Sequence, residues 1–118
     1  MFRSGARRNI SMSKFFNLTS ASTTLVVKED YALYGTNNRR GTNTAKVNKI
    51  TITYQGESTT TVYVYLDGTT DYFIIPKITM PHYSTLVFDE PFSFNVTTHT
   101  LKAVATGDYS NKVTIIID

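Results

Sequence analysis

The chain has 118 residues, enough for one domain with a single modest core and too few for two. It contains no cysteine, which excludes thiol catalysis and cysteine-type zinc sites and favours assembly in a reducing compartment. The net charge is +3 and no apolar run approaches the roughly 20 residues of a membrane span, so we expect a soluble protein made in the cytoplasm.

The basic charge is concentrated at the N-terminus. Residues 1–22 have no acidic side chain, whereas the rest of the chain has eight basic and nine acidic residues. The N-terminal basic residues break up any apolar block of a signal peptide; they are Arg3, Arg7, Arg8 and Lys14. They could contact an acidic protein neighbour or, with little sequence preference, nucleic-acid phosphates. Four charges are few for a dedicated nucleic-acid binder, which favours the protein neighbour.

The same 22 residues show neither helical nor strand periodicity, and Phe15, Phe16 and Leu18 form an isolated apolar cluster. Two adjacent exposed phenylalanines would promote aggregation unless a partner covers them. We therefore expect residues 1–22 to be an extended arm that becomes ordered when Phe15 and Phe16 bind a partner, with a plain disordered tail as the alternative.

From residue 23 the pattern changes to that of a β-protein. A first short strand is predicted at 24–28 and a long polar loop at 35–44. Six further strands follow at regular intervals, each with one apolar face. They are predicted at 47–54, 60–66, 70–75, 85–88, 100–105 and 113–117.

The clearest of these signals is a hairpin within residues 62–78. Val62, Val64 and Leu66 share one face of the first strand, and Tyr63 and Tyr65 share the other. Asp67–Gly68 follows, a dipeptide that supplies the positive φ angles that a tight hairpin needs. The pattern predicts an inward apolar face and an outward tyrosine face.

About seven short strands, each apolar on one side, cannot bury those sides in one open sheet. We therefore predict that residues 23–118 form an all-β, immunoglobulin-like antiparallel sandwich of about seven strands, preceded by the arm. The abundance of threonine, at 20 residues, fits the solvent faces of such sheets. The predicted core consists of Ile50, Ile52, Val62, Val64, Leu66, Leu86, Phe88, Leu101, Ala103, Val113 and Ile115.

The chemical inventory gives little support to an enzyme. His82 and His99 lie on different predicted elements beside turns, where histidines are more often simply solvated than bound to zinc. Asp67, Gly68 and Asp71 do not have the spacing of a calcium loop, and the turn geometry explains the Asp-Gly pair. We expect no catalytic residue, no metal and no cofactor.

The tyrosines are the better candidates for a binding role. Tyr63 and Tyr65 are the only aromatic pair that the pattern places on an outer face, and no basic residue separates them. Such a face favours contact with protein, where tyrosine is enriched. Binding of a glycan, or mere cross-strand pairing, remains open.

Three pieces of the sequence carry a resemblance to a known family: residues 62–68 followed by 72–75, residues 80–88 and residues 101–105. From Ile50 to its C-terminus the chain resembles a family of small β-sandwich structural proteins of tailed bacteriophages, notably those that infect marine cyanobacteria. Members of that family often carry Gly-Asp before the last of these segments, where this chain has Thr98-His99. The resemblance implies a non-enzymatic virion component.

The sequence thus predicts a virion structural protein, foremost a capsid decoration protein that binds shell subunits through its arm and sandwich surface. Its expected partners are the major capsid protein or neck and tail proteins, with other copies of the chain in the assembly and no membrane. A neck or tail adaptor and a host-surface glycan-binding domain are the alternatives. The predicted partner-binding residues are Arg3, Arg7, Arg8, Lys14, Phe15, Phe16, Tyr63 and Tyr65.

Overall fold

The computed structural model describes residues 13–26 and 44–118, and these residues form strands and no helix. Ten strands are present in the described part, where about seven were predicted for the whole domain. They are β2 (Lys14–Asn17), β3 (Ser22–Val26), β4 (Thr44–Val47), β5 (Ile50–Tyr54), β6 (Thr60–Asp67), β7 (Tyr72–Met80), β8 (Ser84–Phe88), β9 (Phe92–Asn95), β10 (Thr100–Gly107) and β11 (Val113–Ile117).

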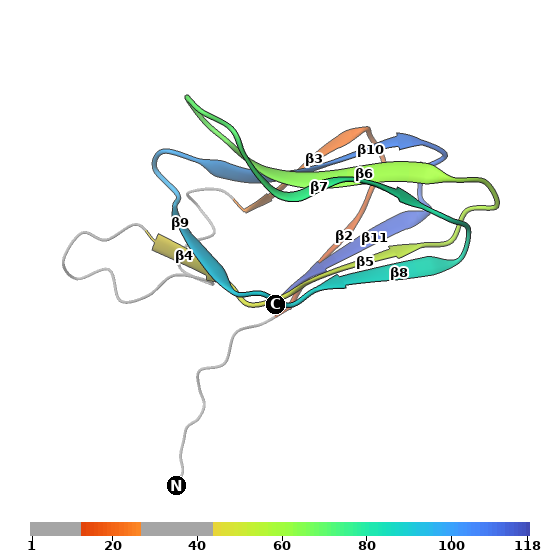
Figure 1. Cartoon of the computed structure of the whole chain (residues 1–118), viewed down its shortest axis with the longest axis horizontal. Helices are drawn as coiled ribbons and strands as arrows, with labels where there is room; N and C mark the ends of the chain where they lie inside the picture. Colours follow the sequence, from red (N-terminus) through yellow and green to blue (C-terminus); the bar gives the residue numbers. More distant parts are fainter. Residues whose placement is uncertain (1–12, 27–43) are drawn as a thin grey trace, which may run out of the picture.

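The strands form two four-stranded antiparallel sheets and one two-stranded ribbon. The first sheet has the order β3-β10-β6-β7, the second has the order β2-β11-β5-β8, and β4 pairs with β9. Figure 1 shows the two sheets as two layers, with the β4–β9 ribbon at one end. The all-β prediction is confirmed, and the layering is that of a sandwich.

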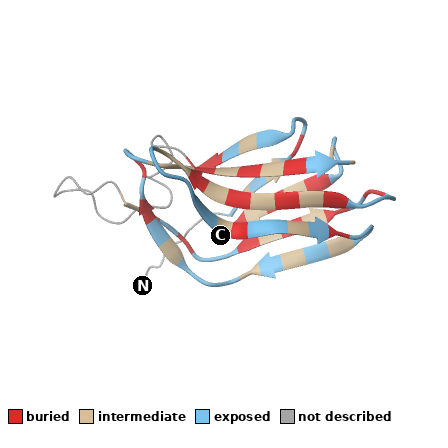
Figure 2. Cartoon of the chain, turned by 45° about the horizontal axis from the view of Figure 1, so that its top comes forward, coloured by how far each residue is buried: buried red, intermediate tan, exposed pale blue. Residues whose placement is uncertain are grey.

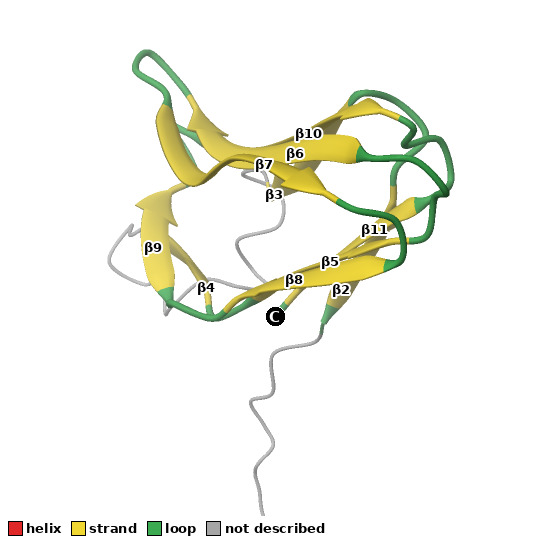
Figure 3. Ribbon diagram, turned by 45° about the vertical axis from the view of Figure 1, so that its right-hand side comes forward, coloured by secondary structure: helices red, strands yellow, loops and turns green. Residues whose placement is uncertain are grey.

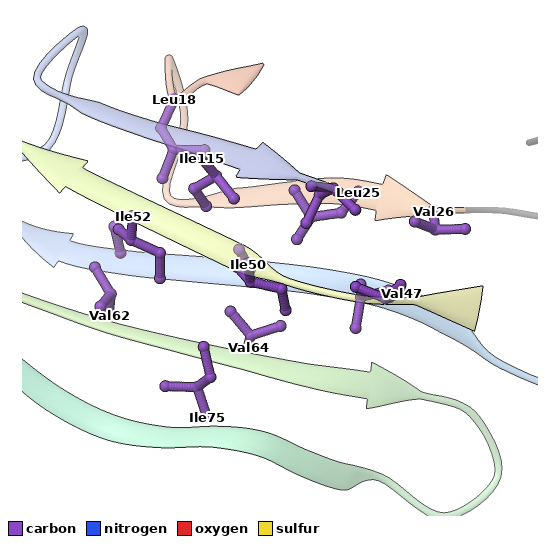
Figure 4. Close-up of a cluster of buried hydrophobic side chains, with 14 of the residues drawn as sticks. Leu18, Leu25, Val26, Val47, Ile50, Ile52, Val62, Val64, Ile75 and Ile115 are labelled. Carbon is purple, nitrogen blue, oxygen red and sulfur yellow. The ribbon is translucent and has the colours of Figure 1, made fainter. Parts of the chain in front are cut away.

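The core lies between the two sheets because each strand alternates apolar and polar residues. Along β6 every second residue is buried, and β5 and β11 behave in the same way, which gives the banded colouring of Figure 2. Side chains from both sheets meet in the interior (Figure 4). Nine of the eleven predicted core residues are buried; Leu86 and Phe88 are half-buried, because β8 is an edge strand with a neighbour on one side only.

The ribbon of β4 and β9 arises because the chain bends on both sides of the pairing, and β9 was not among the predicted strands. The segment expected as one strand at 47–54 is interrupted at Asn48 and Lys49, whose amides donate to the Asp118 carbonyl at 2.7 and 3.2 Å. The partner strand is interrupted in the same region, between β8 and β9, where Pro91 cannot donate to a ladder. As Figure 3 shows, β9 therefore leaves the second sheet and leads toward the first.

The predicted boundary of the N-terminal arm was wrong. Residues 14–17 form β2, which pairs with β11, and Leu18 is 1% exposed within the core. The Leu18 amide donates to the Val113 carbonyl at 2.9 Å, and its carbonyl accepts from the Asn111 amide at 2.8 Å. Strand β3 then pairs in the opposite sheet, so this segment connects both layers. Arg3, Arg7 and Arg8 lie outside the described residues.

The hairpin of β6 and β7 is confirmed, but its turn differs from the expected one. Four residues, 68–71, connect the strands, and Gly68 does not adopt a positive φ. Instead, the Gly68 amide donates to the Asp71 carboxylate at 3.2 Å, and a Cβ at Gly68 would lie 2.5 Å from a carbon of the His99 ring. Glycine is needed here for close approach, whereas Gly107 does have a positive φ, of 90°.

Candidate functional site

The outer face of the first sheet carries an aromatic surface, made of Tyr63, Tyr65 and Phe73. The alternation that buries Val62, Val64 and Leu66 directs the two tyrosines outward, as predicted. The antiparallel register then places Phe73 of β7 opposite Tyr65. The position of Tyr63 and Tyr65 on the outer face thus follows from the β6 pattern alone.

The three rings contact one another. The ring centroids are 5.8 Å apart for Tyr63 and Tyr65, 5.5 Å for Tyr63 and Phe73, and 5.7 Å for Tyr65 and Phe73. These separations lie in the range of favourable aromatic pairs. Phe73 is 55% exposed and the two tyrosines are half-buried, so the three rings form one aromatic area on the solvent side of the sheet.

Phe73 was not among the predicted partner-binding residues. The predicted hairpin was centred on Asp67–Gly68, which gives a different cross-strand register from the four-residue connection, 68–71, that forms. With the observed connection, Tyr65 lies opposite Phe73. Had the length of the connection been predicted correctly, the cross-strand register would have placed Phe73 beside the two tyrosines.

Two lysines flank the aromatic surface. Lys77 lies over the Tyr63 ring, with its Nζ 5.5 Å from the centroid. The pairing of β6 with β7 shifts register on either side of Val64, and Pro76 and Lys77 lie within this irregular stretch, between Ile75 and Ile78. On the other side, Lys102 of β10 lies opposite Tyr65.

The charge of Lys102 is balanced by Asp67, with Nζ and the carboxylate oxygen 2.8 Å apart. This hydrogen bond lowers the pKa of Asp67 and raises the pKa of Lys102. Burial, followed by the nearby Asp67 carboxylate, raises the pKa of Tyr65. Tyr65 therefore keeps its phenolic proton at neutral pH and can donate a hydrogen bond.

Within the described part of the chain, each histidine contacts hydroxyl, carbonyl or aromatic groups of a neighbouring turn. The His99 ring lies against the β6–β7 connection, with one nitrogen 3.1 Å from the Thr70 carbonyl and the other 2.9 Å from the Thr98 hydroxyl. His82 packs edge-on against Tyr83. Among residues 13–26 and 44–118, no group of three histidine, cysteine, aspartate or glutamate side chains is placed to hold a metal ion.

The predicted partner-binding residues that the structure describes lie on different faces of the molecule. Phe15 is 67% exposed on the outer face of the second sheet, on the opposite side of the molecule from Tyr63 and Tyr65. Phe16 points the other way and packs against the core, so it does not share a surface with Phe15. The Lys14 Nζ lies over the Phe16 ring, 5.3 Å from its centroid. Adjacent residues of a strand face opposite sides, which separates the two phenylalanines.

Comparison of the chain with family models, with curated proteins and with solved structures gives no match. Among the described residues there is also no helix that is long and apolar enough to cross a membrane.

Proposed function

We propose that the chain is a non-enzymatic structural protein of a tailed-phage virion, a capsid decoration protein that binds shell subunits through its aromatic surface. The observation that carries the binding role is the mutual contact of Tyr63, Tyr65 and Phe73 on a solvent-facing sheet. The virion assignment comes from the sequence resemblance. We include in the proposal an immunoglobulin-like class for the sandwich, supported by its two facing antiparallel sheets.

The composition of the aromatic surface favours protein over sugar as its ligand. Tyrosine and phenylalanine are enriched at the centres of protein interfaces, where they give up little conformational entropy. A sugar site also needs polar groups that are available beside the rings. Here the neighbouring carboxylate, Asp67, is already paired with Lys102.

The size of the expected effect follows from the behaviour of aromatic interface residues. Loss of a central tyrosine at an interface commonly costs at least about 2 kcal/mol, which is roughly thirtyfold in affinity. Across the three strands β10, β6 and β7, Tyr65 occupies the central position, because it lies between Lys102 and Phe73. We therefore expect Tyr65→Ala to weaken partner binding more than any other single change on this surface.

The test has two parts. Mass spectrometry of purified particles of the phage that encodes the chain should detect the protein as a component of the particle. Recombinant protein should then co-sediment with shells that lack it, and Tyr65→Ala should reduce this binding by about tenfold or more. Thr61→Ala is the matched control, because Thr61 lies on the same strand and face outside the aromatic surface and should leave binding unchanged.

Absence of the protein from purified particles would contradict the virion assignment. Equal binding by the folded Tyr65→Ala variant and the Thr61→Ala control would contradict the role of the aromatic surface. Retention on a glycan array that depends on Tyr65, without binding to shells, would favour the adhesive alternative.

A further inference from the structure

The second sheet is regular from one edge to the other. The three pairings β2–β11, β11–β5 and β5–β8 proceed without any shift of register. One outward row across the four strands is therefore Phe15, Ile116, Thr51 and Val87, and the next is Asn17, Thr114, Thr53 and Thr85. Neither row contains a charged residue.

The edges of the first sheet and the β8 edge of the second sheet differ in how they are protected against pairing. In the first sheet the pairing of each edge strand is irregular, and the edge strand β7 also carries Pro76 and Lys77. Bulges, proline and lysine are the common means by which proteins prevent pairing at a sheet edge. Strand β8 has none of these: Ser84–Phe88 contains no charge and no proline and pairs with β5 in an unbroken register.

The exposed apolar residues of the second sheet lie at its two opposite edges. Phe15 of β2 is 67% exposed and Val87 of β8 is 54% exposed. They occupy the two ends of the same outward row, three strand spacings apart. Each lacks a neighbour on its outer side among the described residues.

The strand directions allow one copy to continue the sheet of another. Because every pairing in the second sheet is antiparallel, β2 and β8 run in opposite directions. A second copy placed beside the first in the same orientation would therefore bring its β2 antiparallel to β8. The outward row would continue from Val87 to Phe15 of that copy.

We propose that copies of this chain associate head to tail, with β8 of one copy paired to β2 of the next. Main-chain hydrogen bonds between the two edges would supply affinity, as in β-strand addition, and the contact of Val87 with Phe15 would fix the register. A head-to-tail contact repeats, so it produces a ring if the rotation closes and a filament if it does not. The inference concerns a different surface from the proposed function and does not depend on it.

Charge complementarity favours this arrangement over a two-fold one. Continuing the register places Lys14 of the next copy beside Phe88, and the exposed residues Asp89 and Glu90 follow directly. A two-fold pairing of β8 with β8 would bring no lysine to these acidic residues, and it would leave Phe15 uncovered at the far edge. Only the head-to-tail contact covers both exposed apolar residues.

The absence of native cysteine makes the geometry directly testable by cross-linking. Continued register places Asn17 of one copy opposite Thr85 of the other, and both side chains are exposed. A mixture of Asn17→Cys and Thr85→Cys proteins should cross-link to each other with a short bismaleimide, whereas neither should cross-link to itself. The Asn17→Cys/Thr85→Cys double variant should form a ladder of covalent multimers on a denaturing gel.

A second variant tests the contact itself. Val87→Lys adds a charge at the edge without disturbing the core, and it should reduce both the cross-linking yield and the multimers seen by light scattering about tenfold or more. Thr53→Lys is the matched control, because Thr53 lies on the same face in the central strand β5. It should leave both unchanged.

Each other outcome would overturn the proposal. Thr85→Cys that cross-links to itself would show two-fold pairing of β8. A protein that stays monomeric, together with a mixture that gives no cross-link at any protein concentration tested, would show that the edges do not pair. Equal association by folded Val87→Lys and Thr53→Lys would place the contact elsewhere.

Discussion

Leu18 gives the sharpest test of how the N-terminal segment is built into the fold. The residue lies within the stretch expected to be a separate arm, yet its side chain is 1% exposed. Replacement by alanine removes the buried side chain and leaves the backbone hydrogen bonds to Val113 and Asn111 in place. The Leu18→Ala variant therefore measures side-chain packing alone.

The expected loss of stability is large. Burial of a leucine side chain stabilises a protein by about 1.5–3 kcal/mol, and the cavity left by truncation brings the typical cost of Leu→Ala to about 2–5 kcal/mol. A domain of this size is stable by only about 5–15 kcal/mol in total. We expect a loss near 3 kcal/mol, which lowers the unfolding temperature by about 10 °C.

Urea unfolding followed by far-UV circular dichroism would measure this loss. The matched control is Phe15→Ala, three residues away and 67% exposed, which should cost less than about 1 kcal/mol. Deletion of residues 1–18 should also destabilise the protein much more than deletion of residues 1–12, because only the longer deletion removes β2. A Leu18→Ala protein as stable as the Phe15→Ala protein would refute the placement of this segment in the core.

Three further outcomes are expected from local geometry. Gly68→Ala should cost about 1–3 kcal/mol in urea unfolding, because the new Cβ would lie 2.5 Å from the His99 ring and could not be accommodated without a shift. Tyr54→Phe should cost about 0.5–1.5 kcal/mol, because the buried phenol loses its hydrogen bond to the Ser58 carbonyl, and an unchanged midpoint would count against that bond. The hydrogen bond from Lys102 lowers the pKa of Asp67 in the folded state below its ordinary value of 3.8. The Asp67 carboxylate therefore stabilises the fold above pH 3.8, and this stabilisation is lost as the pH falls through the folded-state pKa. Lys102→Met should reduce this acid dependence of the unfolding midpoint.

The parts of the fold that were predictable from sequence are those with long, regular alternation. Strand β6 has eight residues in strict alternation, so both its existence and its outward tyrosines follow from period two alone. Strand β2 has four residues, of which two are adjacent phenylalanines, and so short a stretch has no recognisable period. It is a strand because β11 offers an edge, which is tertiary information that the local sequence does not contain.

The candidate surfaces were predictable to the same limited extent. Tyr63 and Tyr65 were placed on the correct face, whereas Phe73 depends on the register of a turn whose glycine is required by the approach of His99, 31 residues later in the chain. The outward row from Phe15 to Val87 needs three strand pairings that join distant segments. A residue pattern along one strand cannot specify which strands become neighbours.

The two proposed contacts lie on different outer faces, and this separation makes them independently testable. The aromatic surface covers β6 and β7 of one sheet, and the head-to-tail contact uses β2 and β8 of the other. A copy that is paired with its neighbours would still present Tyr65 to a partner. We therefore expect Val87→Lys to weaken association between copies about tenfold or more while a single copy keeps its affinity for shells, and Tyr65→Ala to do the reverse. If either change disrupted both contacts in a folded protein, the two surfaces could not be separate binding sites.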